Sequence, residues 1–573
     1  MINKDSIMKN ISKYILTTAL IFIFSACKED FLEFVPEDEP SVGAWYNDEA
    51  QIKATTSSLY GRPWFTFNDK FSWAAGDGMS GDLYQDYQDE GQLFFFSFNE
   101  NNGIISQAWA ALFNVVSFSN SIIDDMPGIA AGNGVSQDVI NAGLGEARFM
   151  RAMAYYFLVE NFGEVPIVER PAERISSNDF AIPKNTVSDI YRFIREDLEF
   201  AKDNLPNSDE PGRVTSWSAK GMLAKIHVTL GQMGSDADFA IAAGYANDVI
   251  NNSGLALMSS YEDLFLIENN NNSESLFALQ WVSGAWGTGN SRQAVFARHS
   301  VLTGNGEAWG GGKCMTKNFT DNVTANANGG TDLRARAIYM SQGDHYPYIQ
   351  AADGGHTYDI VLRDDEDSQL SGQTPGLNSL KKYVVGSFED VGVGVINQAT
   401  PLNQYMLRLA DVYLLLAEAM IGSGASTTDG AALAAFNAVR MRAGLAPDAN
   451  SEVTYEEVFN ERRVELGLEG LSWLEVKRRY HRNGTEAIAY LNGQSRNTRY
   501  YRIDNSVGDE NDPLQYEALA PGESSTLPGS SNVNESQPVV VTDGFMTLPV
   551  PANEVVTNPL LAGDVPAEDY PFE

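Results

Sequence analysis

Apolar residues at helical spacing, many of them in neighbouring segments, constrain the fold of this 573-residue chain more than any other feature. Between residues 186 and 204, for example, Ile190, Phe193, Ile194 and Leu198 fall on one face of a helix. Similar stripes predict about nine helices. They lie at residues 48–60 (a weaker pattern), 106–123, 145–160, 186–204, 216–230, 236–251, 404–420, 430–442 and 455–480.

Several of these helices come as adjacent pairs joined by short turns that contain Gly or Asp. Residues 216–230 and 236–251 form one pair, and residues 404–420 and 430–442 form another. A pair of roughly 35 residues has the size of a tetratricopeptide unit, although the sequence period is too degenerate to prove a repeat. We therefore expect a mainly α fold with a tetratricopeptide-like core of helical pairs. Such an architecture favours binding over catalysis.

Two stretches break the helical pattern. Residues 262 to about 400 are rich in Gly, Asn and aromatic residues, with a β-like piece at 275–281, and residues 481–545 are polar and rich in turns. We predict an irregular, loop-rich inserted region that contains short β elements. The expected organisation is a signal peptide (1–26), an N-terminal helical region (27–261), the inserted ligand-binding region (262–403), the C-terminal part of the helical core (404–480) and a loop-rich C-terminal region (481–573).

Charge and cysteine content exclude several classes of protein. The chain has 39 Lys and Arg against 76 Asp and Glu, a net charge of −37. Such a surface repels nucleic acid and offers no basic patch for anionic lipid. Two cysteines cannot build a disulfide framework or a Cys-rich zinc site. The acidic run at 364–367 could bind calcium, but it lacks the spacing of an EF-hand and is more simply a solvated loop, so we expect no metal and no cofactor.

The N-terminus has the pattern of a lipoprotein signal. Three lysines precede an apolar run at residues 14–24, and Ser-Ala stands directly before Cys27. The run is too short to remain as a membrane-spanning helix, so we expect Cys27 to be the acylated first mature residue. An ordinary signal peptide with a coincidental cysteine is the alternative. The Lys-Glu-Asp that follows resembles an export signal to the outer face of the outer membrane. Cys314 would then be a lone thiol.

Blocks spread along the chain carry a family resemblance. They include GEARFMRAMAYYFLVENFGEVPIV from residue 145, QYMLRLADVYLLLAEAM at 404–420, NAVRMRAGL at 437–445, ERRVELGLEGLSWLEVKRR at 461–479 and LPVP at 548–551. In sequence and order these blocks resemble the SusD/RagB family of outer-membrane nutrient-binding lipoproteins. The chain departs from the family pattern at Leu471-Ser472, where an Arg usually precedes the Trp.

This resemblance implies a function as well as a fold. It implies a surface lipoprotein that sits on a SusC-like, TonB-dependent outer-membrane transporter and captures nutrients, usually oligosaccharides. We expect the chain to bind oligosaccharide or polysaccharide at the cell surface and to deliver it without catalysis. A peptide ligand, a surface glycosidase and a purely structural lid are the alternatives. Because ring stacking tolerates many sugars, the identity of the ligand stays open.

Aromatic residues in loop-like sequence are the candidate binding residues. Carbohydrate recognition uses flat aromatic faces together with polar groups for the hydroxyls. The Gly-rich segment 73–84 and the segment WVSGAW at 281–286 offer both, and family members carry a loop similar to the first. For each segment, ordinary packing or a structural turn is the alternative. The candidates are Trp73, Asp77, Asp82, Tyr84, Trp281, Trp286 and Trp309.

No motif of a catalytic site is present in the sequence. There is no H-E-x-x-H motif and no G-x-S-x-G motif. The alternating charges between residues 461 and 478 are typical of pairs on a helix surface, so we assign them to structure. Trp109, Trp217 and Trp473 lie in expected helices, where a tryptophan most simply anchors a core.

Overall fold

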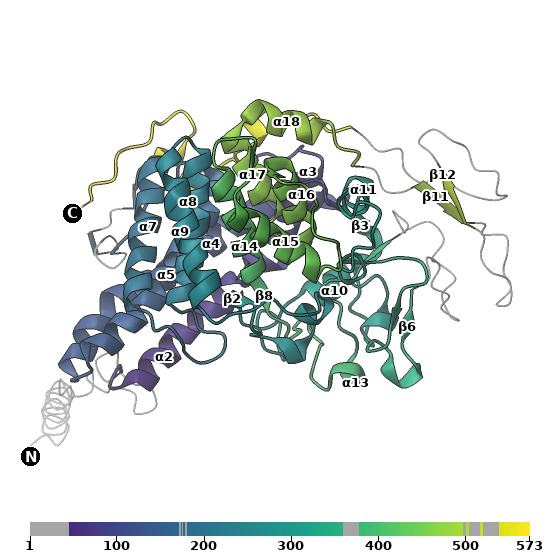
Figure 1. Cartoon of the computed structure of the whole chain (residues 1–573). Helices are drawn as coiled ribbons and strands as arrows, with labels where there is room; N and C mark the ends of the chain where they lie inside the picture. Colours follow the sequence, from purple (N-terminus) through teal and green to yellow (C-terminus); the bar gives the residue numbers. More distant parts are fainter. Residues whose placement is uncertain are drawn as a thin grey trace, which may run out of the picture.

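A computed structural model describes residues 45–170, 174, 176, 177, 180–358, 378–496, 500–503, 516–519 and 538–572. The fold is mainly α, as the sequence predicts, with long helices packed together and short strands and loops at one side (Figure 1). The signal segment 1–26, Cys27 and the acidic run 364–367 lie outside the described residues. None of the described helices is both long enough and apolar enough to cross a membrane.

The first half of the helical core consists of helices that pack on their neighbours in chain order. These are α4 (Gly103–Gly132), α5 (Gln137–Phe162), α7 (Val187–Asn204), α8 (Ser216–Gln232) and α9 (Asp236–Asn252). Helix α5 contacts both α4 and α7, and α8 contacts both α7 and α9. The apolar stripes that predict these helices are buried in these contacts. The expected pairing of α8 with α9 is confirmed.

The second half of the core adds five helices from the C-terminal third of the chain. They are α14 (Leu409–Ile421), α15 (Gly430–Arg442), α16 (Tyr455–Glu465), α17 (Ser472–Arg482) and α18 (Gly484–Asn492). Helix α14 contacts α8, α9 and α15, so the two expected pairs join into one layer of helices (Figure 1).

Two predicted helices are wrong in part. The one expected at 404–420 begins as a strand, β8 (Gln404–Arg408), which pairs antiparallel with β2 (Ser275–Leu279). The one expected at 455–480 is divided between α16 and α17. Leu468 (φ 62°) and Gly470 (φ 81°) between them adopt left-handed backbone conformations, which a right-handed helix cannot include.

The region between residues 262 and 403 is irregular, as expected, and its strands are mostly two residues long. Its boundaries stay a prediction. Its helices are α10 (Arg292–Phe296), α11 (Lys317–Asn326), α12 (Ala335–Ile338) and α13 (Phe388–Val391). Its paired strands include β4 (Tyr339–Met340) with β7 (Ser379–Leu380) and β5 (His345–Tyr346) with β6 (His356–Thr357). Strand β3 (Cys314–Met315) pairs with β1 (Leu83–Tyr84) from the N-terminal region.

The remaining α-helices and paired strands are short and lie before, between or after these regions. They are α2 (Glu49–Ser57), α3 (Gln88–Phe94), α19 (Ala552–Thr557), β9 (Ser426–Thr427) paired with β10 (Val453–Thr454), and β11 (Tyr500–Ile503) paired with β12 (Tyr516–Leu519). Cys314 is a free, buried thiol, as expected.

The charged residues between 461 and 478, in α16, in α17 and in the loop between them, are buried, so the predicted surface location is wrong. Arg462 donates to Glu475 of α17 and to Asp411 of α14. Glu465 pairs with three arginines from outside its own helix, and Arg478 pairs with Glu418. A buried charge needs such partners because it has lost its hydration. The residues have the structural role predicted, but inside the core.

A buried carboxylate joins α5 to α7 and α17. Glu160 accepts a hydrogen bond from Tyr191 and faces His481 at 3.3 Å. Burial alone would raise the pKa of Glu160, but His481, Lys477 and Tyr191 lower it from 4.5 to about 2.

This shift predicts an acid-dependent part of the stability. Because the pKa is lower in the folded state, Glu160 stabilises the fold above pH 4.5, and this contribution is lost as the pH falls towards 2. Between pH 5 and 2, the free energy of unfolding of Glu160→Gln is expected to fall by about 3 kcal/mol less than that of the parent protein. Urea titrations of both proteins at several pH values measure these free energies of unfolding. Equal pH slopes in the two proteins would contradict the assignment.

Candidate functional site: two exposed tryptophans on connected loops

The Gly-rich segment around Trp73 is a packed structural element and not a loop. It forms two short π-helices, η5 (Phe67–Phe71) and η6 (Ala74–Met79). Trp73 is 1% exposed, and its indole N–H donates to the Asp69 carbonyl at 2.6 Å. A Cβ at Gly76 would lie 2.3 Å from the Gly470 carbonyl oxygen, so this glycine permits close backbone contact with the α16–α17 loop. The expectation that Trp73 stacks on ligand is corrected, because the ring has no free face.

The polar candidates of this segment bond to the protein itself. The Asp77 carboxylate accepts hydrogen bonds from the backbone N–H groups of Leu468 (3.1 Å) and Gly470 (3.0 Å), and burial raises its pKa from 3.8 to about 7. Asp82 pairs with Arg463 of α16. Tyr84 is buried, and its hydroxyl donates to Asp86 at 3.2 Å. Asp77, Asp82 and Tyr84 therefore hold η6 and β1 in place, which corrects their assignment to ligand.

Trp281 is also buried. Its ring packs edge-on against Phe65 with a centroid distance of 6.2 Å. As the second residue after β2, it continues the buried side of that strand into the core. The expected ligand contact is corrected for Trp281, because its ring is covered by protein.

Trp286 lies on the surface, 54% exposed, in the turn that follows Trp281. The backbone N–H of Val282 donates to the Thr288 carbonyl at 3.0 Å and closes this turn. Beneath the Trp286 ring, Phe65 packs at a centroid distance of 4.8 Å and an interplanar angle of 79°. Phe65 in turn rests on Trp281, so the exposed ring has a buried aromatic support that limits its motion.

Trp309 is the second exposed tryptophan, at 48%. Its backbone N–H donates to the Ala294 carbonyl at 2.7 Å. The next residue, Gly310, approaches the Phe296 carbonyl so closely that a Cβ would lie 2.1 Å from its oxygen. Only glycine fits there, and the contact anchors the Trp309 loop to α10.

A lysine accompanies Trp309. The Lys313 ammonium donates to the Trp309 carbonyl at 3.2 Å and lies 5.3 Å from the centre of the buried Trp73 ring. Burial lowers the pKa of Lys313 from 10.5 to about 8, so the group stays protonated at neutral pH. Beside an exposed ring it can donate hydrogen bonds to a hydroxyl or carboxylate of a ligand.

Hydrogen bonds connect the loops that carry the two tryptophans. Asn397 donates to the Gly284 carbonyl at 2.9 Å, and the neighbouring Gln398 N–H donates to Glu307 at 2.8 Å. Residues 395–398 thus bridge the Trp286 turn and the Trp309 loop. We call residues 282–288, 303–313 and 386–398 the loop cluster. It also exposes Val282, Phe388 and Ile396.

The comparisons with known proteins agree with this architecture. The sequence profile described as "SusD family" matches residues 259–563, and the one described as "Starch-binding associating with outer membrane" matches residues 30–228. A SusD-like protein from Bacteroides ovatus is 33% identical over 573 residues, which is 99% of both chains. The chain belongs to the SusD family.

Other family members extend the comparison. A solved structure described as a complex with a xylogluco-oligosaccharide is 31% identical, covers 91% of this chain and 99% of its own, and superimposes with a TM-score of 0.77. The starch-binding protein SusD of Bacteroides thetaiotaomicron is 22% identical over 68% of this chain and 72% of its own.

Sequence reasoning missed Phe65 and Lys313, which support and flank the exposed rings. Phe65 lies in a helical stretch far from residue 286 in sequence, and Lys313 carries no signal beyond its place four residues after Trp309. In the part of the chain that the structure describes, no group of three or more His, Cys, Asp or Glu side chains is arranged to hold a metal ion.

Proposed function

We propose that this protein binds oligosaccharide or polysaccharide through the loop cluster, with Trp286 and Trp309 as stacking surfaces. The observation that carries the proposal is that both exposed rings stand on loops that are hydrogen-bonded to each other, with the Trp286 ring packed on the buried Phe65. Sugar rings pack their apolar faces on such rings and bond their hydroxyls to polar neighbours. Lys313 and the backbone groups of the loop cluster supply those bonds. The similar structure with a xylogluco-oligosaccharide supports a glycan as the ligand.

The proposal includes a location and a partner. The lipoprotein signal predicts a lipid anchor at Cys27, and one matching profile describes association with the outer membrane. We propose that the chain is anchored by this lipid on the outer face of the outer membrane. From there it passes its ligand to a SusC-like, TonB-dependent transporter. Mass spectrometry of the membrane-extracted protein would detect the acylated Cys27 peptide, and an unmodified N-terminus would contradict the anchor.

Binding without catalysis is the function that the site supports best. A glycosidase needs two carboxylates about 5–10 Å apart across a cleft. The acidic candidates Asp77 and Asp82 are buried and are bonded to the α16–α17 loop and to Arg463. They are therefore not available to a glycan on the surface. A peptide ligand on the same rings is the second candidate.

Calorimetry of the chain from residue 28 against a panel of plant, host and microbial glycans tests the proposal. We expect saturable heat with xyloglucan-type or other plant oligosaccharides, ending after each injection. Continuing heat flow would indicate turnover and contradict a pure binding function. No heat with any glycan, but binding of peptides, would replace the glycan by the peptide alternative.

A further inference from the structure

Lys313 is a cation without a carboxylate partner beside the exposed Trp309. Its ammonium has three N–H donors, of which one donates to the Trp309 carbonyl at 3.2 Å. Within the part of the chain that the structure describes, the ammonium forms no ion pair and no other hydrogen bond. The side chain is partly exposed. Two of its donors are therefore left for a ligand that packs on the Trp309 ring.

A second lysine on a tryptophan ring shows what Lys313 lacks. The Lys220 ammonium of α8 lies 4.2 Å from the centre of the Trp217 ring and pairs with Asp248 at 2.6 Å. The Lys313 ammonium lies 5.3 Å from the centre of the Trp73 ring but has no such carboxylate. The two lysines therefore share an aromatic contact and differ in their counterion.

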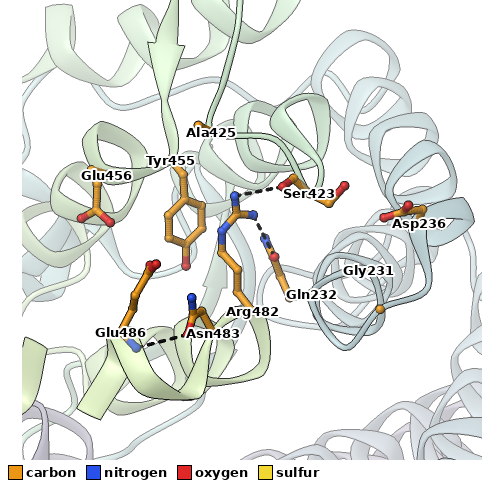
Figure 2. Close-up of a pocket in the computed structure, with 11 residues that line it drawn as sticks. Gly231, Gln232, Asp236, Ser423, Ala425, Tyr455, Glu456, Arg482, Asn483 and Glu486 are labelled. Carbon is orange, nitrogen blue, oxygen red and sulfur yellow. Dashed lines mark hydrogen bonds between the residues drawn. The ribbon is translucent and has the colours of Figure 1, made fainter. Parts of the chain in front are cut away.

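Other cations that form no ion pair in the described chain are buried or engaged. Lys381 and Lys477 are 1% and 5% exposed and donate to backbone carbonyls. Arg482 lies in a pocket of about 490 Å³ between the α8–α9 turn and α18 (Figure 2). Its guanidinium donates to the Gly422 carbonyl at 2.8 Å and to Gln232 at 3.1 Å. The lining also includes the carboxylates of Asp236, Glu456 and Glu486. An anionic ligand is therefore disfavoured in that pocket.

The backbone fixes the position of Lys313 relative to Trp309. The Lys313 N–H donates to the Gly310 carbonyl at 3.0 Å and closes the short 3-10 turn η10 (Gly310–Gly312) between the two residues. On the other side of Lys313, β3 begins at the next residue and pairs with β1. Because the backbone is held on both sides, little of its conformational freedom is lost when a ligand binds. The pair forms a preorganised site with an apolar face and a positive charge beside it.

The charged neighbours of Lys313 are engaged with other groups. Glu90 of α3 pairs with Lys70 at 3.3 Å. The exposed Asp86 accepts a hydrogen bond from the Tyr84 hydroxyl at 3.2 Å. Burial and the charge of Lys70 lower the pKa of Lys313 to about 8, although the two carboxylates act in the opposite direction. A carboxylate in direct contact would restore the stabilisation that the ammonium lost with its hydration.

From this arrangement we infer that the bound glycan is acidic, and that a sugar carboxylate pairs with Lys313 while the sugar ring packs on Trp309. Hydrogen bonds from an ammonium to a carboxylate are roughly twice as strong as those between neutral groups. The inference rests on the proposed glycan function and deepens it by naming the substrate class. A plant uronic acid and a host sialic acid offer the same carboxylate chemistry, so the test distinguishes these two sources.

Matched acidic and neutral glycans test the inference by calorimetry on the chain from residue 28. Trigalacturonate and sialyllactose are each compared with their own methyl ester, which keeps the sugar and removes the charge. The acid of at least one pair is expected to bind about tenfold more tightly than its ester, and that pair identifies the source. Equal affinity within both pairs, or no binding of either acid at millimolar concentration, would overturn the inference.

The same experiment separates this inference from the proposed function. If neutral glycans bind but the acids bind no more tightly than their esters, the glycan function stands and the acidic substrate class is wrong. Binding of a triglutamate peptide, without binding of any glycan, would contradict both.

Variants of the two lysines locate the charge. In Lys313→Gln the roughly tenfold preference for the acid over its ester is expected to disappear, because an amide donates hydrogen bonds but carries no charge. Lys313→Arg keeps the charge and should keep the preference. Lys220→Gln removes the matched lysine on Trp217, outside the loop cluster, and should leave the preference unchanged. An unchanged preference in Lys313→Gln would overturn the inference.

The pH dependence of the parent chain tests the same pairing without a substitution. The ammonium pairs with a carboxylate only while it is protonated, and the pKa of Lys313 lies at about 8 in the free protein. The preference for the acid over its ester should therefore fall about fivefold between pH 7 and 9. A preference that stays constant over this range would contradict the pairing with Lys313.

Discussion

Replacing Trp286 and Trp309 together with alanine is expected to lower the affinity for the glycan ligand by a factor on the order of 100. Each ring offers a large apolar face to a sugar, and the loss of two such faces removes a few kcal/mol of binding free energy. Because about half of each ring is exposed in the free protein, the fold should lose little stability. Calorimetry with the ligand found in the panel measures the change.

A matched control separates stacking from a general loss of aromatic surface. Phe118 on α4 is 50% exposed, like the two tryptophans, but it lies outside the loop cluster. Phe118→Ala should bind the glycan as the parent chain does. Unchanged affinity of the double tryptophan variant, with an intact melting transition, would remove the loop cluster as the binding site.

Glu465→Gln is expected to lower the free energy of unfolding by about 3–5 kcal/mol. The Glu465 carboxylate is fully buried and pairs with Arg334 (2.9 Å), Arg408 and Arg442. Burial alone would raise its pKa, but these three arginines hold it well below 4.5, so the carboxylate is charged at neutral pH. Removing its charge leaves three buried guanidinium groups with one anion fewer.

Glu465 lies where three separate parts of the chain meet. Arg334 belongs to the inserted region, Arg408 ends β8, and Arg442 ends α15, so one carboxylate joins three parts of the chain. Urea unfolding monitored by tryptophan fluorescence measures the effect. Glu196→Gln, which breaks an exposed pair with Arg192, is the control and should cost less than about 1 kcal/mol. Equal losses in the two variants would show that burial of the Glu465 network contributes nothing.

Much of the helical core could be predicted because its signals are local. The stripe of Ile190, Phe193, Ile194 and Leu198 repeats at the helical period, and all four side chains are buried. A helix end set by backbone conformation is harder to predict, as the division at Leu468 shows. That residue takes a left-handed conformation because the α16–α17 loop must meet Asp77, some 390 positions away in sequence.

The candidate site was predicted only in part, because exposure depends on the whole fold. Trp73, Trp281, Trp286 and Trp309 occupy similar Gly-rich sequence, yet two are buried and two are exposed. Gly76 near Trp73 and Gly310 next to Trp309 both permit close backbone packing, although the Trp73 ring is buried and the Trp309 ring is exposed. No local pattern distinguishes a glycine that admits a neighbouring backbone from one that forms a surface turn.

By itself, the amino-acid sequence determined the helices, the family and the expectation of a lipid anchor, because each depends on residues close together in the chain. Only the tertiary structure decided which tryptophans face solvent and which charges are buried. Arg334, Arg408 and Arg442 come from separate parts of the chain, and their meeting at Glu465 is a result of packing. Packing depends on contacts between distant segments, which a linear pattern does not record.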